Sequence, residues 1–272
     1  MNYRHFYHAG NFADVFKHLI MVLATDYLQQ KDKGLMLLDS FAGCGIYDLS
    51  APEAQKTGEY AEGIGQIMSI GSLNADLRRY QDLIEPYWLK HTYPGSPLLL
   101  AKLLRPQDRI IANELHPEDY ESLRLALGRF NHTRLTKMDA YECIRANIPP
   151  QERRGLVLID PPFEKKNEFE LLIHQMQEWK KRWSTGCYMI WYPIKAHLPV
   201  TALHDAAREL GLNRTWVADF LIHDRDQPDT FNGCGVLMMN TPYQLPEKIS
   251  TLTPELCSLL GGRMETTYLT DE

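Results

Sequence analysis

The sequence predicts an α/β protein whose sheet has seven mainly parallel strands and whose first connection carries a small helical insertion. Short apolar runs alternate with stretches of helical periodicity, the pattern of a parallel sheet covered by helices. Four of the apolar runs end at an acidic residue or just before one. Ligands bind at the carboxyl ends of strands in open α/β sheets, so these residues predict a binding edge.

The chain has 272 residues, which predicts one large domain or one domain with a sizeable insertion. Its formal net charge of −6 argues against coating nucleic acid by charge alone, but it is compatible with one local basic face. Five scattered cysteines without a CxxC pair predict a reduced chain with no disulfide and no zinc site. No apolar run suits a signal peptide or a membrane span. We therefore expect a cytoplasmic protein that uses no membrane and no metal.

The strands are expected in seven apolar segments, and helices in the amphipathic segments between them. Gly211 is placed to end the helix before the sixth strand. The predicted strands are, in chain order, 35–39, 109–113, about 134–137, 155–159, 186–192, about 215–222 and 235–239. The clearest predicted helices are 98–104, 169–183 and 198–210.

One interval is too long for a simple nucleotide-binding fold. There, an acidic residue follows the glycine turn by about 20 residues. Here Gly45 and Glu114 are 69 positions apart, which is 114 minus 45. Residues 49–92 are mostly helical in pattern, and we expect them to form a helical insertion subdomain within a single domain spanning 1–272.

The first strand ends in Asp39, and a turn containing Gly43 and Gly45 follows it. Glycines allow backbone N–H groups to approach a ligand closely. A carboxylate at Asp39 would repel a pyrophosphate but would hold the ammonium group of a methionine. An ordinary tight turn between strand and helix explains the same residues equally well.

Glu114 and Asp139 follow the second and third strands. A carboxylate at Glu114 suits a bidentate bond to ribose hydroxyls, and Asp139 suits the amino group of an adenine. A solvated strand end and a helix N-cap are the alternatives for these two residues. Each signal is weak singly, but their order on successive strands together with Asp39 and Asp160 strengthens the ligand interpretation.

The most specific motif is Asp160-Pro161-Pro162-Phe163 after the fourth strand. The prolines fix the backbone, so that the Asp160 carboxylate and the Pro161 carbonyl can both accept hydrogen bonds from an exocyclic amine. Phe163 offers a ring face on which a flipped-out base would stack. Trp191, at the end of the fifth strand, forms either a wall of the base pocket or part of the core. The motif predicts methylation of a base amino group, most simply adenine N6.

Basic and aromatic residues indicate where a nucleic acid strand would bind. Tyr3, Arg4 and His5 lie in an N-terminal segment dense in cationic and stacking groups, which is typical of single-strand contacts. Lys165 and Lys166 directly follow the proposed catalytic loop and are placed to meet phosphates.

These motifs together give the chain its resemblance to a known family, the ribosomal RNA large subunit methyltransferase J family. The resemblance runs from end to end of the chain. It is carried by 3–5, 6–11, 13–15, 17–18, 57–60, 93–97, 114–117, 153–155, 158–162 and 191–193. It implies a Rossmann-like class I S-adenosylmethionine-dependent methyltransferase fold. It also implies methylation of N6 of adenine 2030 in 23S rRNA. We expect a monomer, with protein-free rRNA or an early assembly intermediate as the substrate.

The resemblance also implies roles for individual residues. Asp160 is similar to the family's proton acceptor, Tyr3 to a contact with the substrate RNA, and Lys17 to a residue beside the cofactor. The positions similar to cofactor contacts are His18, Phe41, Ser96, Glu114, Asp139, Ala140 and Asp160, to which Asp39 and Gly43 are added from the strand-end pattern.

Three residues depart from the family pattern. The family commonly has His where Phe41 stands and Gly where Ala140 stands, so only backbone or packing contacts are expected at these two positions. Phe163 replaces a Tyr, which keeps the stacking face and loses a hydroxyl. We expect activity to persist.

Two other functions remain open from the sequence. A DNA adenine-N6 methyltransferase has the same order of motifs, but a dedicated target-recognition domain is not visible here. A catalytically inactive RNA-binding assembly factor would keep the fold, but the intact Asp160-Pro161-Pro162 argues against it.

Overall fold

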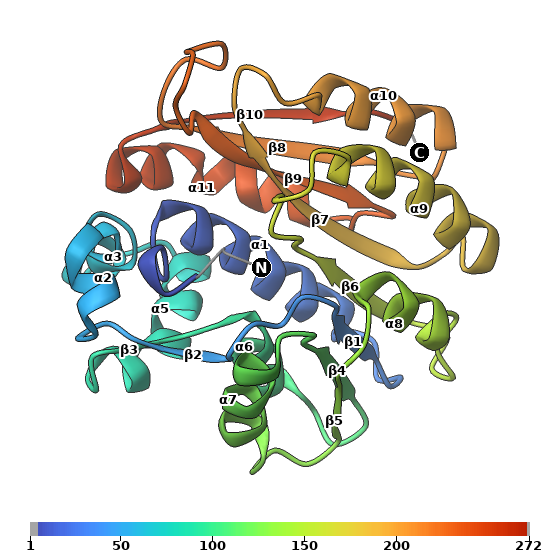
Figure 1. The fold of residues 1–272 in the computed structure, drawn as a ribbon, viewed down its shortest axis with the longest axis horizontal. Coiled ribbons are helices and arrows are strands. Elements are labelled where there is room, and N and C mark those ends of the chain that lie inside the picture. Colours follow the sequence, from blue (N-terminus) through green and yellow to red (C-terminus); the bar gives the residue numbers. More distant parts are fainter. Residues whose placement is uncertain (1–4, 271–272) are drawn as a thin grey trace.

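The computed structural model describes residues 5–270, and Figure 1 shows a central sheet with helices on both faces. The sheet has eight strands within this part of the chain, in the order β10-β8-β9-β7-β6-β1-β4-β5. Strands β5, β4, β1, β6 and β7 pair in parallel, and β9, β8 and β10 each pair antiparallel with their neighbours. The strands are β1 (Met36–Asp39), β4 (Arg109–Asn113), β5 (Thr133–Thr136), β6 (Gly155–Ile159), β7 (Cys187–Ile194), β8 (Trp216–Leu221), β9 (Gly233–Met239) and β10 (Arg263–Tyr268).

The central strands are apolar on both faces because helices cover both. All residues of β1 and β6 are buried, the near-continuous apolar pattern of a doubly covered parallel strand. The side chains of successive residues point to opposite faces of the sheet. Leu37 packs with the helices of one layer and Leu38 with those of the other.

The helices form two layers around this sheet (Figure 1). Asn11 caps α1 by accepting hydrogen bonds from two backbone N–H groups of its first turn. Gly211 ends α10 in the left-handed conformation, as predicted. The helices outside the insertion are η1 (His5–Tyr7), α1 (Phe12–Leu28), α6 (Ser96–Leu103), α7 (Pro117–Leu127), α8 (Ala140–Asn147), α9 (Glu168–Arg182), α10 (Val200–Leu210) and α11 (Leu245–Leu260).

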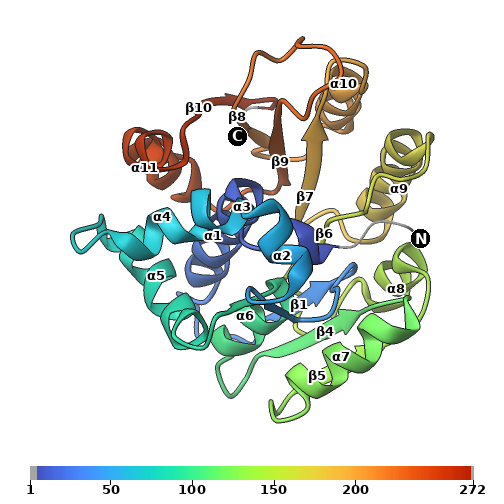
Figure 2. The same cartoon turned by 60° about the vertical axis from the view of Figure 1, so that its left-hand side comes forward.

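The segment between β1 and α6 holds four helices, and a two-stranded antiparallel ribbon brackets them. Figure 2 shows these helices beside α1, on the opposite side of the molecule from α8–α10. Their buried side chains, such as Ile64 and Tyr80, join the same core cluster as α1. They are therefore packed onto the main body, and their division into a subdomain stays a prediction. The elements are β2 (Ile46–Asp48), α2 (Pro52–Thr57), α3 (Glu59–Glu62), α4 (Ile64–Ser69), α5 (Ala75–Trp88) and β3 (Thr92–Pro94).

This topology confirms the predicted fold class, that of a Rossmann-like class I S-adenosylmethionine-dependent methyltransferase. The sheet has one strand more than the seven predicted, because β10 adds to the edge at β8. Five of the six residues of β10 are exposed, so no apolar run marked it. Within residues 5–270, every helix is too short or too polar to cross a lipid bilayer.

Candidate active site

The strand order reverses beside β1, which lies between β4 and β6. Ligands bind in the crevice outside the carboxyl ends of the strands at such a switch point. Asp39 is the last residue of β1, and Asp160 directly follows β6. The two carboxylates are therefore at the same edge of the sheet, where the sequence predicted a site.

Asn113, the last residue of β4, joins the loops that form this edge and was not among the predicted site residues. Its side-chain amide donates to the carbonyl oxygens of Ser40, at 3.1 Å, and Met138, at 3.0 Å. Its side-chain oxygen accepts from the Thr136 hydroxyl at 2.8 Å. Asn113 thus fixes the loops after β1, β4 and β5 to one another. A buried polar residue ending an apolar run was the only signal.

Asp39 is fully buried and only half satisfied. Its Oδ2 accepts a 2.6 Å hydrogen bond from the Ser96 hydroxyl. Its Oδ1 is buried without a hydrogen-bond partner in the described chain, although the backbone N–H of Phe41 approaches the carboxyl group. Burial, opposed by Ser96 and reinforced by the charge of Asp160, raises the pKa of Asp39 to about 7. An unpaired buried oxygen is costly unless a ligand satisfies it, and an ammonium group would do so.

The glycine turn and Glu114 are joined by a hydrogen bond. The backbone N–H of Gly43 donates to Glu114 Oε2 at 2.8 Å, and the N–H of His116 donates to Oε1 at 2.7 Å. Gly43 has a φ of +63°, and a Cβ there would lie 2.7 Å from the Tyr47 hydroxyl, so this turn needs glycine. Burial raises the pKa of Glu114 even though the two N–H groups oppose the shift. Each oxygen keeps a lone pair for a further donor.

Asp139 caps α8, as the helix-cap interpretation predicted. Its Oδ1 accepts from the backbone N–H groups of Tyr141, at 3.0 Å, and Glu142, at 3.1 Å. Asp139 itself is exposed, and Ala140 is buried at the first position of the helix. Phe41 packs edge-on against the Tyr141 ring, with ring centroids 5.9 Å apart. The cap leaves Oδ2 available, so the cofactor role of Asp139 stays a prediction.

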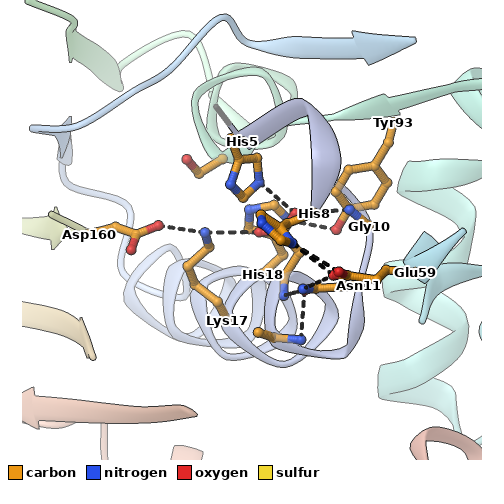
Figure 3. Close-up of polar contacts among 12 residues, drawn as sticks. His5, His8, Gly10, Asn11, Lys17, His18, Glu59, Tyr93 and Asp160 are labelled. Carbon is orange, nitrogen blue, oxygen red and sulfur yellow. Dashed lines mark hydrogen bonds and ion pairs between the residues drawn. The ribbon is translucent and has the colours of Figure 1, made fainter. Parts of the chain in front are cut away.

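Lys17 connects the predicted catalytic loop to α1 (Figure 3). Its ammonium group lies 2.6 Å from Asp160 Oδ2 and 3.0 Å from Asp14 Oδ1, and the side chain is 6% exposed. Burial opposes the charge, but attraction to Asp160 and Asp14 prevails and raises the pKa of Lys17 well above its usual value. Lys17 is therefore a permanent cation that holds one oxygen of Asp160.

Asp14 also contacts residues near the start of the described chain. Its Oδ2 accepts from the backbone N–H of Gly10 at 2.9 Å and lies 2.8 Å from His5 Nε2. Burial would raise the pKa of Asp14, but the neighbouring His5 and Lys17 hold it well below its usual value. The structure thus brings His5, Lys17 and Asp160 into one network. Tyr3 and Arg4, predicted to contact RNA, lie outside the described residues.

His18 lies one residue along the same helix and is 1% exposed. Its ring stacks on Tyr93, and its Nδ1 lies 2.8 Å from the Tyr93 hydroxyl. Burial lowers the pKa of His18 to about 3. The imidazole is therefore neutral at every physiological pH.

Phe163 forms an aromatic wall beside the Lys17–Asp160 pair. Its ring centroid lies 5.1 Å from that of Phe169 and 6.0 Å from that of Trp191. The Lys17 ammonium lies 5.9 Å from the centroid of Trp191. Phe163 has a φ of +51°, a strained conformation for a non-glycine residue that is often found at functional sites. Phe163 and Trp191 are both partly exposed, as a stacking surface requires.

Lysines and one histidine lie on the two loops that flank this wall. Lys165 and Lys166 are exposed between Phe163 and α9. Lys195, partly exposed, and His197, exposed, follow β7 on the neighbouring parallel strand, so they lie at the same edge. Neither Lys195 nor His197 was predicted from the sequence. Among residues 5–270, no group of three or more His, Cys, Asp or Glu side chains is arranged to hold a metal ion.

Comparison with known proteins agrees with this geometry. Residues 32–269 match the family model described as "Ribosomal RNA large subunit methyltransferase D, RlmJ". Two curated proteins named "Ribosomal RNA large subunit methyltransferase J" are similar over 264 residues, which is 96% of this chain and 94% of each relative. They come from Haemophilus influenzae, at 36% identity, and Escherichia coli, at 35%. A crystal structure of a Legionella pneumophila protein is 30% identical, with a TM-score of 0.85 over 96% of this chain and 97% of that one.

Proposed function

The chain belongs to the RlmJ family of ribosomal RNA large subunit methyltransferases, and we propose that it transfers a methyl group from S-adenosylmethionine directly to N6 of an adenine in 23S rRNA. The expected target is adenine 2030. The observation that carries the proposal is the Asp160–Phe163 loop, whose carboxylate and ring face lie at the same sheet edge as the half-satisfied Asp39. We further propose a cytoplasmic monomer that acts on protein-free or early-assembly rRNA.

The residues at the first two strand ends fit the cofactor. The unpaired Oδ1 of Asp39 matches the ammonium of the methionine part, and Glu114 retains lone pairs for the ribose hydroxyls. The glycine turn brings the backbone close enough for a ligand to lie against it. Asp139 Oδ2 is placed to accept from the adenine amino group, and His18 and Ser96 complete the proposed set. When bound, S-adenosylmethionine supplies an electrophilic methyl group on a positively charged sulfur.

The catalytic loop is proposed to orient the target amine. Lys17 occupies Asp160 Oδ2, which leaves Oδ1 to accept one amine hydrogen, and the Pro161 carbonyl accepts the other. This arrangement turns the nitrogen lone pair, otherwise delocalised into the ring, toward the methyl group. Phe163 stacks on the flipped-out base. Positioning of this kind supplies most of the rate, and the surplus proton then leaves to Asp160 or to solvent.

Lys17 cannot act as the base, because its raised pKa keeps it protonated. Its role in this scheme is to fix Asp160 and to balance the carboxylate charge inside the site. The sulfonium of the cofactor and the ammonium of Lys17 are both cations, and the carboxylates of Asp160 and Asp14 beside Lys17 offset this positive charge.

The RNA is proposed to lie across the loops after β6 and β7. Lys165, Lys166 and Lys195 flank the aromatic wall and offer positive charge to phosphates on both sides of a flipped base, and His197 lies beside them. His5, paired with Asp14 beside the catalytic loop, is proposed to contact the same RNA strand, and the proposed RNA contacts Tyr3 and Arg4 lie outside the described residues. The helical insertion at 49–92 is proposed to add to this face.

A methylation assay with protein-free 23S rRNA and duplex DNA tests the substrate. We expect methyl transfer to rRNA, mapped by mass spectrometry to one N6-methyladenine, and none to DNA. Methylation of DNA alone would identify a DNA enzyme, and no transfer to either would identify an assembly factor without catalysis.

Two variants test the assigned residues. Asp160→Asn should abolish methylation, and the variant should still unfold in a cooperative thermal transition, as a folded protein does. The double variant Lys165→Gln/Lys166→Gln should raise KM for RNA. It should also reduce the slope of log affinity against log salt concentration by the equivalent of about two phosphate contacts. Lys180→Gln/Lys181→Gln on α9, away from the catalytic loop, is the matched control. Equal effects of the two double variants would refute the proposed RNA path.

A further inference from the structure

Three buried side chains from three different elements form a continuous hydrogen-bonded chain that ends at His18. Tyr80 comes from α5 in the insertion, Tyr93 from β3, and His18 from α1. The two hydroxyls lie 2.8 Å apart, and the Tyr93 hydroxyl lies 2.8 Å from His18 Nδ1. Tyr80 and Tyr93 are both 0% exposed. None of the three makes another side-chain hydrogen bond within residues 5–270.

All three groups are uncharged. Burial raises the pKa of both phenols above their usual value, and it lowers the pKa of His18 to about 3. Asp14 acts against the shift at His18, whereas Lys17 and His5 add to it. The three hydrogen-bonded side chains therefore share three polar hydrogens: one on each phenol oxygen and one on either ring nitrogen of His18.

Only one arrangement of these hydrogens satisfies both hydroxyl groups. If Tyr80 donates to Tyr93 and Tyr93 donates to His18 Nδ1, both hydroxyl hydrogens have an acceptor. If His18 instead carried its hydrogen on Nδ1, Tyr93 would donate to Tyr80, and the Tyr80 hydrogen would have no acceptor in the described chain. A buried hydroxyl hydrogen without an acceptor is unfavourable, so the first arrangement is preferred.

We propose that Tyr93, supported by Tyr80, is a positioning residue that holds His18 in the tautomer with its hydrogen on Nε2. His18 thereby presents a neutral N–H donor to an acceptor atom of the cofactor. The proposal rests on the proposed function in one respect, that His18 faces the cofactor. Neither tyrosine touches the cofactor in this scheme.

The tautomer matters because it decides which ligand atom His18 can meet. An Nε2–H group fits an acceptor such as a carboxylate oxygen, whereas a bare Nε2 fits only a donor. A protonated ring would add a third cation beside Lys17 and the sulfonium. The neutral donor therefore suits the carboxylate of the methionine part without adding charge repulsion.

The segment that contains Tyr93 also contacts Asp39, the second residue proposed to bind the methionine part. Ser96 stands three residues after Tyr93 and donates to Asp39 Oδ2 at 2.6 Å. The segment that returns from the insertion, from Tyr93 on β3 to Ser96 at the start of α6, thus contacts both His18 and Asp39, the two groups proposed to meet the methionine part. The insertion itself contributes Tyr80, whose hydroxyl supports that of Tyr93.

Nitrogen-15 NMR of the histidine rings tests the tautomer directly, in protein without cofactor. We expect the wild-type His18 signals to show a protonated Nε2 and an unprotonated Nδ1, from pH 6 to 8. Tyr93→Phe should remove this preference, and Tyr80→Phe should keep it because Tyr93 still donates to Nδ1. A wild-type ring protonated on Nδ1 would overturn the proposal, whatever the enzyme methylates.

Calorimetric binding of S-adenosylmethionine supplies the second measurement. Tyr93→Phe should weaken binding about tenfold, the size of one buried hydrogen bond and its dependent contact. KM for S-adenosylmethionine should rise similarly while kcat changes less than about twofold. Tyr87→Phe is the control, the same change on α5 at a hydroxyl that is no part of this hydrogen-bonded chain. Equal affinities for Tyr93→Phe and Tyr87→Phe would overturn the proposal. If Tyr93→Phe does not fold, the wild-type and Tyr80→Phe spectra decide it.

Discussion

Replacement of Asp39 by asparagine should make the stability of the protein without cofactor less dependent on pH. Asp39 is fully buried, and its pKa is raised from 3.8 to about 7. The folded protein therefore retains, between about pH 4 and pH 7, a proton that the unfolded chain has released. Stability from this group is highest at low pH and falls as the pH rises toward 7.

The size of the effect follows from that separation. Each pKa unit corresponds to about 1.4 kcal/mol. Between pH 5 and pH 8 the wild-type protein should lose about 2 to 3 kcal/mol of stability through Asp39, because the folded-state proton is retained up to about pH 7. The asparagine side chain of the variant has no proton to lose in this range. Any fixed cost of burying its amide is the same at both pH values and cancels in the comparison.

Urea unfolding of both proteins at pH 5 and pH 8, without cofactor, measures this difference. We expect Asp39→Asn to gain about 2 to 3 kcal/mol relative to wild type over that interval. It should also lose S-adenosylmethionine binding, since the carboxylate proposed to hold the ammonium is gone. A stability difference that is the same at pH 5 and pH 8 would refute the raised pKa, and retained cofactor affinity would refute the ammonium contact.

Three further substitutions probe other parts of the molecule. Lys17→Met should lower the free energy of unfolding in urea by about 3 kcal/mol, because Asp14 and Asp160 lose the cation that they share. An unchanged unfolding midpoint would contradict this. Phe163→Tyr should keep methylation within about threefold and Phe163→Ala should lose at least about tenfold, since the ring face is what stacks; equal rates would show that the ring is not used. Asp108→Ala should lower stability by about 2 to 4 kcal/mol, because this 1% exposed carboxylate accepts from several donors, including Arg105. Cofactor affinity should stay unchanged, because Asp108 precedes β4 at the far end of the sheet.

Much of the fold could be predicted because its signals are local. Each central strand is a short apolar run, and β4 and β6 match their predicted bounds at 109–113 and 155–159. Strand β10 could not be found this way, since its residues are mostly exposed and it exists through pairing with β8. The ribbon of β2 and β3 gave no signal either, because its two strands are three residues long and far apart in the chain.

The candidate site was likewise predictable only where its signals are local in the sequence. The acidic residues at the strand ends were predictable, because parallel strands bring their carboxyl ends to one edge. The contacts made by Lys17 were not, since 143 positions separate it from Asp160. Asn113 likewise gave little signal on its own, and its importance comes from the loops it joins.

The sequence by itself determined the central strands of the sheet, the edge at which their acidic residues lie and the Asp160–Phe163 motif, because periodicity and residue type at strand ends depend on neighbours in the chain. Only the tertiary structure decided the state of the buried groups. It placed Lys17 between two carboxylates, left one oxygen of Asp39 without a hydrogen-bond partner among residues 5–270 and joined His18 to Tyr93. The pKa and the hydrogen-bonding role of such groups depend on burial and on partners distant in the chain, which the order of residues does not show.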